Sequence, residues 1–294
     1  MTDKPLITIG MPVYNGEKHI NQALQSILAQ TERNFRLIIS DNCSTDKTLE
    51  ICQYYARIDE RVSVTSSERN EGPIYNFLNV VQNVNTPYFM WAAHDDVWSE
   101  DWIEKLLYLH DGSTALTFGS VINISEDGTE LGTYTPKNFR RNSKRSQLEF
   151  FLEEDTKGKA NLIYGIYKTE HVVNLAPRAL GELDFADDML FVFLILQHGD
   201  IMITTTTKLF KRVTPRVCRW GNLRKIVSRL LMLERIRTYY YYYKRVKNKN
   251  LKVLFFTLLP IKYFLSLSVN FRILGLRLLS LMKNLFLRAL RINN

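Results

Sequence analysis

Two pairs of neighbouring aspartates carry side chains that could bind a metal ion or transfer a proton. Asp95 and Asp96 directly follow the apolar run over 88–93. Adjacent carboxylates repel one another unless a cation shares them, and hard oxygen donors suit Mg²⁺ or Mn²⁺ ions that bridge to substrate phosphates. The alternative is a solvated turn that caps the next helix. The chain has no HExxH motif that would indicate a zinc site beside His94.

The second pair, Asp187 and Asp188, begins a helical pattern over 189–197. Acidic residues are favoured at a helix N-terminus, which gives the pair a purely structural interpretation. The functional interpretation is a general base, with one carboxylate held in a cleft near an incoming hydroxyl.

Another carboxylate, Asp41, ends the predicted strand over 35–40 and has Ser44, Thr45 and Asp46 behind it. A carboxylate in this place can accept hydrogen bonds from a ribose or a base edge. A helix-capping loop is the alternative. No GxGxxG follows the first strand and no GxxxxGK occurs, so a dehydrogenase and a P-loop enzyme are both excluded.

The elements that position these residues follow an alternating order of strands and helices. Such an order predicts an α/β fold with a mostly parallel, Rossmann-like sheet and helices on both faces. Ligands bind outside the carboxyl ends of such strands, which is where the polar clusters fall. We expect strands over 6–13, 35–40, 62–65, 88–92, 115–124, 129–134, 161–167 and 201–206, and helices over 17–30, 46–56, 73–84 and 187–197, with a mobile loop over 136–159 that carries one helix near 147–153.

Four segments together carry a family resemblance over about the first 110 residues. They are ITIGMPVYNGEKHINQALQSILAQT, LIISDNCSTDKT, RNEGPIYNFLNVV and YFMWAAHDDVW. In order and spacing they resemble the family 2 glycosyltransferases of the GT-A fold. The resemblance implies a bacterial surface-polysaccharide enzyme that moves a sugar from a nucleotide-sugar donor in a single displacement with inversion.

The resemblance also implies roles for individual residues. The nucleotide-sugar would be bound by Pro12, Tyr14, Asn15, Glu17, Asp41, Asn70 and Asp95. Asp96 would be the direct ligand of Mn²⁺ or Mg²⁺, with His94 in the usual first acidic slot. Asp187 and Asp188 would form the later acidic pair, with Asp188 as the base. Metal then neutralises charge on the leaving nucleoside diphosphate.

Charge is distributed unevenly along the chain. Residues 208–294 hold 21 Lys or Arg against the single acid Glu234, a net charge of +20, while residues 1–207 carry −11. We expect a catalytic domain over 1–215 and a basic, apolar helical region over 216–294. Over 273–292, one narrow polar stripe marks an otherwise apolar helix that suits a lipid interface: Arg277, Ser280, Asn284, Arg288 and Arg291.

The basic region favours an anionic membrane surface as partner over nucleic acid, because its bases alternate with long aliphatic residues. The run over 251–271 lies in the interface or, as an alternative, forms a single span; Lys262 near its centre disfavours the span. With Cys43, Cys52 and Cys218 widely spaced and no secretory signal, we expect the cytoplasmic face of the inner membrane, with a peripheral or monotopic attachment.

The main hypothesis is a metal-dependent inverting glycosyltransferase that acts on a glycan or polyprenyl-linked acceptor. The alternatives are a nucleotidyl or phosphoryl transferase that uses the same metal and nucleotide, and a catalytically silent membrane scaffold. The length of 294 residues and 46% apolar content exclude a disordered protein.

Overall fold

The structure, a computed structural model, describes residues 4–153, 158–181, 187–213, 233–246, 249–265 and 267. The chain divides into two compact units. Unit 1 contains the described residues up to 150 and from 158 to 213. Unit 2 contains residues 151–153 and the described residues from 233 onward. The predicted boundary at 215/216 lies outside the described residues.

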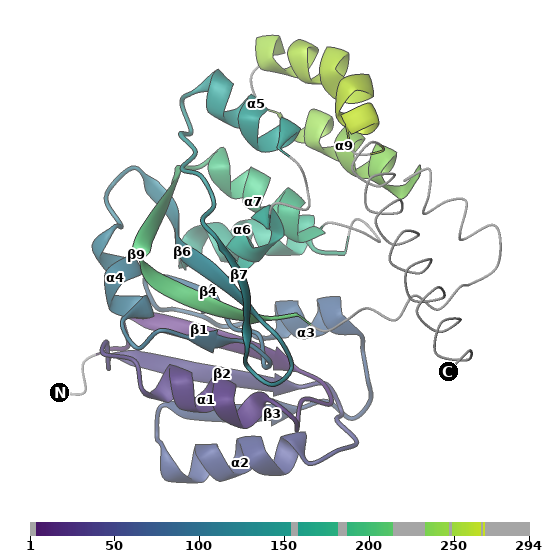
Figure 1. Cartoon of the computed structure of the whole chain (residues 1–294). Helices are drawn as coiled ribbons and strands as arrows, with labels where there is room; N and C mark the ends of the chain where they lie inside the picture. The colour runs from purple at the N-terminus through teal and green to yellow at the C-terminus, as the bar shows by residue number, and fades with distance from the viewer. Residues whose placement is uncertain are drawn as a thin grey trace, which may run out of the picture. The chain divides into compact units, whose positions relative to one another are not determined.

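Unit 1 begins with four parallel strands in the order β3-β2-β1-β4. They are β1 (Ile7–Val13), β2 (Phe35–Asp41), β3 (Val62–Ser66) and β4 (Tyr88–Trp91). Helices α1 (Ile20–Leu28) and α3 (Pro73–Asn79) cover opposite faces of this sheet, and α2 (Thr48–Ile58) lies beside α1 (Figure 1). The predicted α/β architecture is therefore confirmed, and the predicted parallel pairing holds for these four strands.

The second half of the sheet is mixed and continues from β4 through β8-β6-β9-β5. Strand β8 (Ile166–Lys168) is antiparallel to both β4 and β6 (Thr114–Ile124), whereas β9 (Asp200–Arg212) runs parallel to β6. This half of the sheet also contains the short edge strand β5 (Val97–Trp98) and the strand β7 (Glu130–Tyr134), which pairs antiparallel with β6. Helix α4 (Trp102–Tyr108) lies between β5 and β6 in the chain.

Several elements differ from the sequence-based predictions. Strand β5 and helix α4 were not predicted, and α3 ends at Asn79 instead of at 84. The expected strand over 161–167 is a 3₁₀ helix, η1 (Lys159–Tyr164), followed by the short β8. Helix α6 (Thr169–Ala179) was not predicted, and its in-helix Pro177 obscures the pattern. Strand β9 extends to Arg212 instead of ending at 206, because its pairing with β6 resumes at Lys208 after an irregularity.

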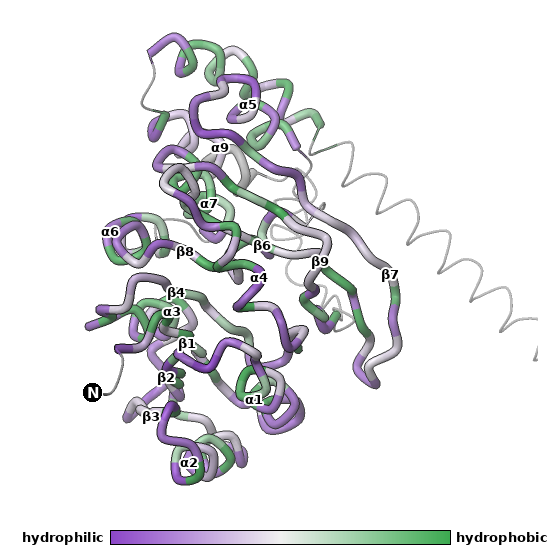
Figure 2. The backbone as a smooth tube through the Cα atoms, turned by 90° about the vertical axis from the view of Figure 1, so that its left-hand side faces the viewer, coloured by the Kyte–Doolittle hydropathy of each residue, from purple (hydrophilic) through white to green (hydrophobic). Residues whose placement is uncertain are grey.

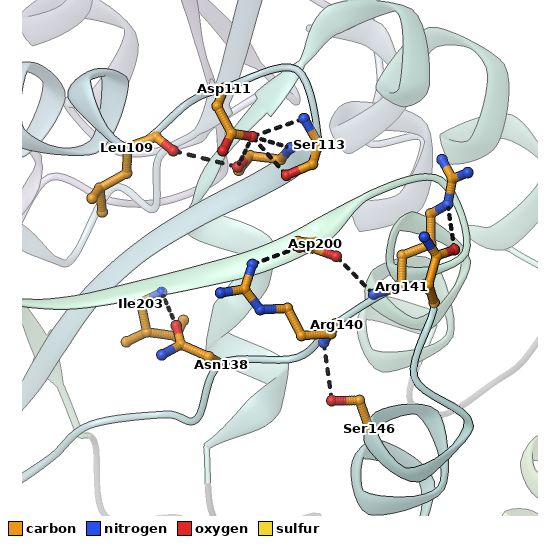
Figure 3. Close-up of polar contacts among 11 residues, drawn as sticks. Leu109, Asp111, Ser113, Asn138, Arg140, Arg141, Ser146, Asp200 and Ile203 are labelled. Carbon is orange, nitrogen blue, oxygen red and sulfur yellow. Dashed lines mark hydrogen bonds and ion pairs between the residues drawn. The ribbon is translucent and has the colours of Figure 1, made fainter.

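The segment before α5 (Lys144–Leu152), expected to be a mobile loop, is fastened to the start of β9 (Figure 3). Arg140 Nη1 donates to Asp200 Oδ2 at 2.7 Å and the Arg141 backbone N–H donates to Oδ1 at 2.8 Å. Phe139 pairs with Ile201 in an antiparallel bridge. One carboxylate thus fixes the path of this segment.

Helix α7 (Asp187–Leu196) lies in the core of unit 1, where its residues from Met189 to Leu196 are all buried. In Figure 2, where hydrophobic residues are green, the apolar residues that follow the two aspartates of α7 agree with this position. The rings of Trp91 and Phe191 meet edge to face with centroids 5.3 Å apart. This contact joins α7 to β4, so the start of α7 is placed relative to the end of β4 by core packing.

Unit 2 contains α9 (Leu233–Arg245) and a helix over 249–265. Phe151 packs against Phe255, with ring centroids 4.5 Å apart. Lys262 is buried and donates to the carbonyl of Glu153 at 2.6 Å. Within the described part of the chain, no helix is long and apolar enough to cross a membrane. The predicted helix over 273–292 lies outside the described residues.

Candidate active site

The loop after β1 forms one wall of the candidate site. Pro12 is buried at the end of β1, opposite Ser40, while Tyr14 is 42% exposed. Asn15 has a φ of 49°, a left-handed conformation that Asn tolerates better than most residues. Its Oδ1 accepts a hydrogen bond from Thr45 N at 2.8 Å, and its backbone N–H donates to Ser44 Oγ at 2.9 Å. Asn15 therefore ties this loop to the loop after β2.

Glu17 makes the same kind of connection. Its Oε2 accepts from the Lys47 backbone N–H at 2.9 Å, and its own N–H donates to Asp46 Oδ2 at 3.2 Å. Both predicted nucleotide-binding residues, Asn15 and Glu17, thus use their side chains to fix the wall. The exposed ring beside them is that of Tyr14.

Asp41 is fully buried at the end of β2. Its Oδ2 accepts hydrogen bonds from Ser44 N at 3.1 Å and Ser66 Oγ at 3.0 Å. Its Oδ1 has no hydrogen-bond partner among the described residues. A buried acceptor without a donor costs free energy, so Asp41 is suited to receive a hydrogen bond from a ligand.

Two asparagines continue this wall. Asn42 Nδ2 donates to Asn70 Oδ1 at 2.9 Å, and Asn42 Oδ1 accepts from Glu71 N at 2.9 Å, so the predicted Asn70 is joined to Asp41's neighbour. Asn76, on α3, is buried and donates to the carbonyl of Val13 at 3.1 Å, while its Oδ1 has no partner among the described residues. Sequence reasoning missed Asn76; its one signal was an amide on the buried face of a short apolar helix.

The two aspartates after β4 are held from β9. Asp96 is fully buried, and its Oδ2 accepts from Lys211 Nζ at 2.9 Å while its Oδ1 accepts from the Arg212 backbone N–H at 2.9 Å. Burial raises the pKa of the Asp96 carboxyl, whereas the ammonium of Lys211 lowers it. Sequence reasoning missed Lys211, because it lies beyond the predicted end of the last strand.

The guanidinium of Arg212 fastens this part of the site to three other segments. Nε donates to the carbonyl of Asp95 at 3.1 Å, and Nη1 donates to the carbonyls of Ser125 and Glu126 at 3.0 and 2.8 Å. Nη2 donates to Gln22 Oε1, on α1, at 2.8 Å. Arg212 is 6% exposed, so these bonds are largely shielded from water.

The residues around Asp96 do not fit a divalent ion in this arrangement. Both carboxylate oxygens already accept hydrogen bonds, and the described residues contain no group of three or more His, Cys, Asp or Glu that could hold a metal ion. A Mg²⁺ ion about 2.1 Å from Oδ2 would lie at most roughly 5 Å from Lys211 Nζ. Repulsion between these two cations would therefore be at least about 6–7 kcal/mol at an effective dielectric constant near 20. Burial lowers the pKa of His94 and so favours its neutral ring, which brings no negative charge to balance a cation.

The acidic pair that begins α7 converges on the same region through Tyr164. Burial is the main cause that raises the pKa of Tyr164 to about 12, and the nearby carboxylates of Asp96, Asp95 and Asp188 add to it against Lys211. Lys211 Nζ lies 4.9 Å above the centroid of the Tyr164 ring. Tyr164 is thus within electrostatic reach of Asp188 and of the two aspartates after β4. Asp187 Oδ2 accepts from Gly181 N at 2.7 Å, a contact that fixes the start of the helix.

Comparisons with known proteins show the family to which the sequence is similar. A sequence model of the family described as "Glycosyl transferase family 2" matches residues 8–164. A Bacillus subtilis protein named for teichuronic acid biosynthesis, the glycosyltransferase TuaG, is 33% identical over 132 residues, which is 45% of this chain and 52% of that protein. A Haemophilus influenzae glycosyltransferase is 32% identical over 132 residues, 45% of this chain and 53% of its own length. The matches thus span about half the length of these relatives.

Solved structures share the fold. Staphylococcus aureus TarS (residues 1–349, with UDP) aligns with a TM-score of 0.57 and 17% identity, over 82% of this chain and 65% of that chain. The mannosyltransferase PcManGT from Pyrobaculum calidifontis, with GDP-Man and Mn²⁺, has a TM-score of 0.57 and 14% identity, over 97% of this chain and 81% of that chain.

Proposed function

Because the chain belongs to glycosyl transferase family 2, we propose that it transfers a sugar from a nucleotide-sugar donor to a hydroxyl group of a glycan or lipid-linked acceptor. The observation that carries the proposal is the convergence of buried acceptors and acids at the carboxyl ends of β1, β2 and β4. In an open α/β sheet, this edge is where ligands bind. The relative named for teichuronic acid biosynthesis supports cell-surface polysaccharide as the product class.

The donor's nucleotide is proposed to lie against Asp41. Asp41 Oδ1 is buried and lacks a protein donor among the described residues, so an N–H of a base or a hydroxyl of a ribose would complete it. The exposed ring of Tyr14 lies at the start of the adjacent wall. Solved structures of similar fold hold UDP, UDP-GlcNAc and GDP-Man, which supports a nucleotide-sugar as the donor class.

The proposed reaction is a single displacement with inversion. The acceptor oxygen attacks the anomeric carbon, the bond from that carbon to the diphosphate breaks, and the acceptor's proton passes to Asp188. Asp188 suits this role because it begins α7 and, like Asp95 and Asp96, acts electrostatically on Tyr164. Asp187 supports the start of α7 through its bond to Gly181. The metal dependence expected from the sequence is not part of this proposal, and no step here involves a metal.

Product analysis tests the proposal. The full chain is incubated with UDP- and GDP-sugars and a glycan acceptor. Release of a nucleoside diphosphate together with a sugar-bearing acceptor is the expected result. Pyrophosphate release would instead indicate a nucleotidyl transferase, and no turnover with any donor would leave only a scaffold. D188N is expected to lower kcat at least a hundredfold, while D59N, a matched change outside the site, is expected to retain wild-type turnover.

Attachment to an anionic membrane surface is proposed for unit 2. The helix over 249–265 buries Leu251, Phe255 and Lys262 on one side. Its other side exposes apolar side chains over about half the circumference: Val253, Leu254, Phe256, Ile261, Phe264 and Leu265. Together with the basic composition of residues 208–294, this face suits a peripheral position at the inner leaflet of the cytoplasmic membrane.

Flotation with vesicles that contain anionic lipid tests the attachment. The wild-type chain is expected to float with such vesicles, and the double variant F256D/F264D is expected to stay at the bottom of the gradient. Y108D changes a 90% exposed residue of unit 1 in the same way and serves as the control. Flotation of F256D/F264D at the wild-type level would contradict the proposed surface.

A further inference from the structure

A positively charged side chain of the protein itself, that of Lys211, faces Asp96. Strand β9 runs parallel to β6 up to Arg212 and so carries Lys211 to the aspartates after β4. Lys211 Nζ lies 2.9 Å from Asp96 Oδ2. We propose that the ammonium group of Lys211, and not a divalent ion, supplies the positive charge for the donor's diphosphate, so that this chain binds nucleoside diphosphates without metal. The inference rests on the proposed function and deepens it.

The position of Lys211 allows it to reach a ligand. Its side chain is 22% exposed, whereas the Asp96 side chain is fully buried. Among the described residues, the ammonium makes one hydrogen bond, to Asp96, and lies over the ring of Tyr164. An ammonium group has three N–H donors, so the contacts described leave donors for phosphate oxygens. A lysine is a common point charge for phosphate in proteins.

The cost of the arrangement also favours a functional role. Placing a lysine and an aspartate in a poorly hydrated site costs desolvation energy that their attraction often does not repay. Lys211 Nζ and Asp96 Oδ2 are nevertheless paired at 2.9 Å, and the side chain of Lys211 keeps 22% of its surface exposed. A costly pair that stays open on one side is consistent with a charge kept for a ligand.

The chemistry balances without a metal. When the bond between the anomeric carbon and the diphosphate breaks, the electron pair stays on the leaving oxygen and negative charge grows there. Lys211 donates a hydrogen bond to that charge and keeps its proton, while the acceptor's proton passes to Asp188. A charge-assisted hydrogen bond of this kind stabilises a developing anion without a change in protonation of the lysine.

Calorimetric titration of the full chain tests the proposal, with UDP and GDP as the probes. Each titration is run once with EDTA and once with Mn²⁺. The expected result is binding of one probe with affinities that agree within about threefold between the two conditions. Binding in Mn²⁺ that disappears in EDTA would overturn the inference and leave the proposed function intact. Binding of neither probe in either condition would overturn the proposed function and the inference together.

Substitutions of the lysine give a second test. In EDTA, K211M is expected to weaken binding of the probe at least about tenfold, the scale of one hydrogen bond to a charged group. K211R is expected to retain most of the affinity. K208M removes the same charge from an exposed position on β9 and is the matched control, with affinity within about twofold of wild type.

A purely structural role of Lys211 gives a different outcome. K211M leaves the Asp96 carboxylate buried and unpaired, so the double variant D96N/K211M is measured beside it. The D96N change replaces the carboxylate with a neutral amide, so no unpaired charge is buried and the double variant is expected to keep the fold. The inference expects the double variant to melt near the wild-type temperature and still bind the probe at least about tenfold more weakly in EDTA. Wild-type affinity in a folded double variant would overturn it.

Discussion

Replacing Arg212 tests whether one side chain holds the site together. The guanidinium donates four hydrogen bonds, to three backbone carbonyls and to Gln22 Oε1, and it is 6% exposed. A hydrogen bond to a charged group contributes about 1.5–3 kcal/mol, but the bonds are not additive and some freed acceptors regain water. For R212M we therefore expect a loss of about 3–5 kcal/mol in the free energy of unfolding, which is less than the sum for four such bonds.

Urea unfolding followed by tryptophan fluorescence measures this loss, because Trp91, Trp98 and Trp102 are all buried in unit 1. A loss of that size corresponds to a decrease in melting temperature of roughly 6–20 °C for a domain of this size. R212K keeps the positive charge but lacks the planar set of N–H donors of a guanidinium group. Its free energy of unfolding is therefore expected to lie between those of R212M and wild type. R69M, which removes an 80% exposed arginine paired with Glu71, is the control and is expected to change stability by less than about 0.5 kcal/mol. A loss below about 1 kcal/mol in R212M would refute the reasoning.

Three further predictions concern binding, pH and packing. D41A is expected to weaken binding of UDP or GDP at least about tenfold by calorimetry, because it removes the buried acceptor Oδ1; unchanged affinity would contradict the assignment. Burial lowers the pKa of His110 to about 4, from an unfolded value near 6.5, so the unfolded chain binds the proton more readily and stability decreases as pH falls from about 7 to 4, by up to about 3 kcal/mol. H110Q is expected to flatten that part of a pH series of urea unfolding curves, and an unaltered slope would show that His110 is not the cause. G10A places a Cβ 2.7 Å from Val80 Cγ2 and should cost about 1–3 kcal/mol, whereas G132A, with open space around it, should be near neutral in the same unfolding assay.

The sequence predicted the first half of the fold well because its signals there are local. Strand β1 is a continuous apolar run, buried along its whole length, and α1 repeats its apolar residues at helical spacing. The rule that polar residues at parallel strand ends share one edge placed Asp41 and Asp96 in one region. These predictions needed only periodicity and topology.

The second half was harder because distant pairing decides it. Strand β9 contains the exposed polar residues Thr205 and Thr206, so its apolar pattern ends early, and its last residues are strand only because β6 pairs with them. The roles of Asn15 and Glu17 depend on backbone N–H groups of the next loop, which residue types do not reveal. The partner of Asp96 lies 115 positions along the chain, beyond the reach of any local pattern.

The length of that separation has a consequence for how the protein acquires its structure during synthesis. Until the ribosome has released the end of β9, Asp96 has no ammonium beside it, and the backbone around Asp95 lacks its guanidinium donor. A nascent chain that already contains every loop that faces the nucleotide therefore still lacks the partner of Asp96. Burial of the Asp96 carboxylate then costs desolvation free energy that no ion pair offsets. Lys211 and Arg212 therefore make their contacts late in synthesis. Contacts between residues so far apart in the sequence also form slowly. Truncation anywhere before Lys211 should thus yield a chain that stalls as a partly ordered sheet.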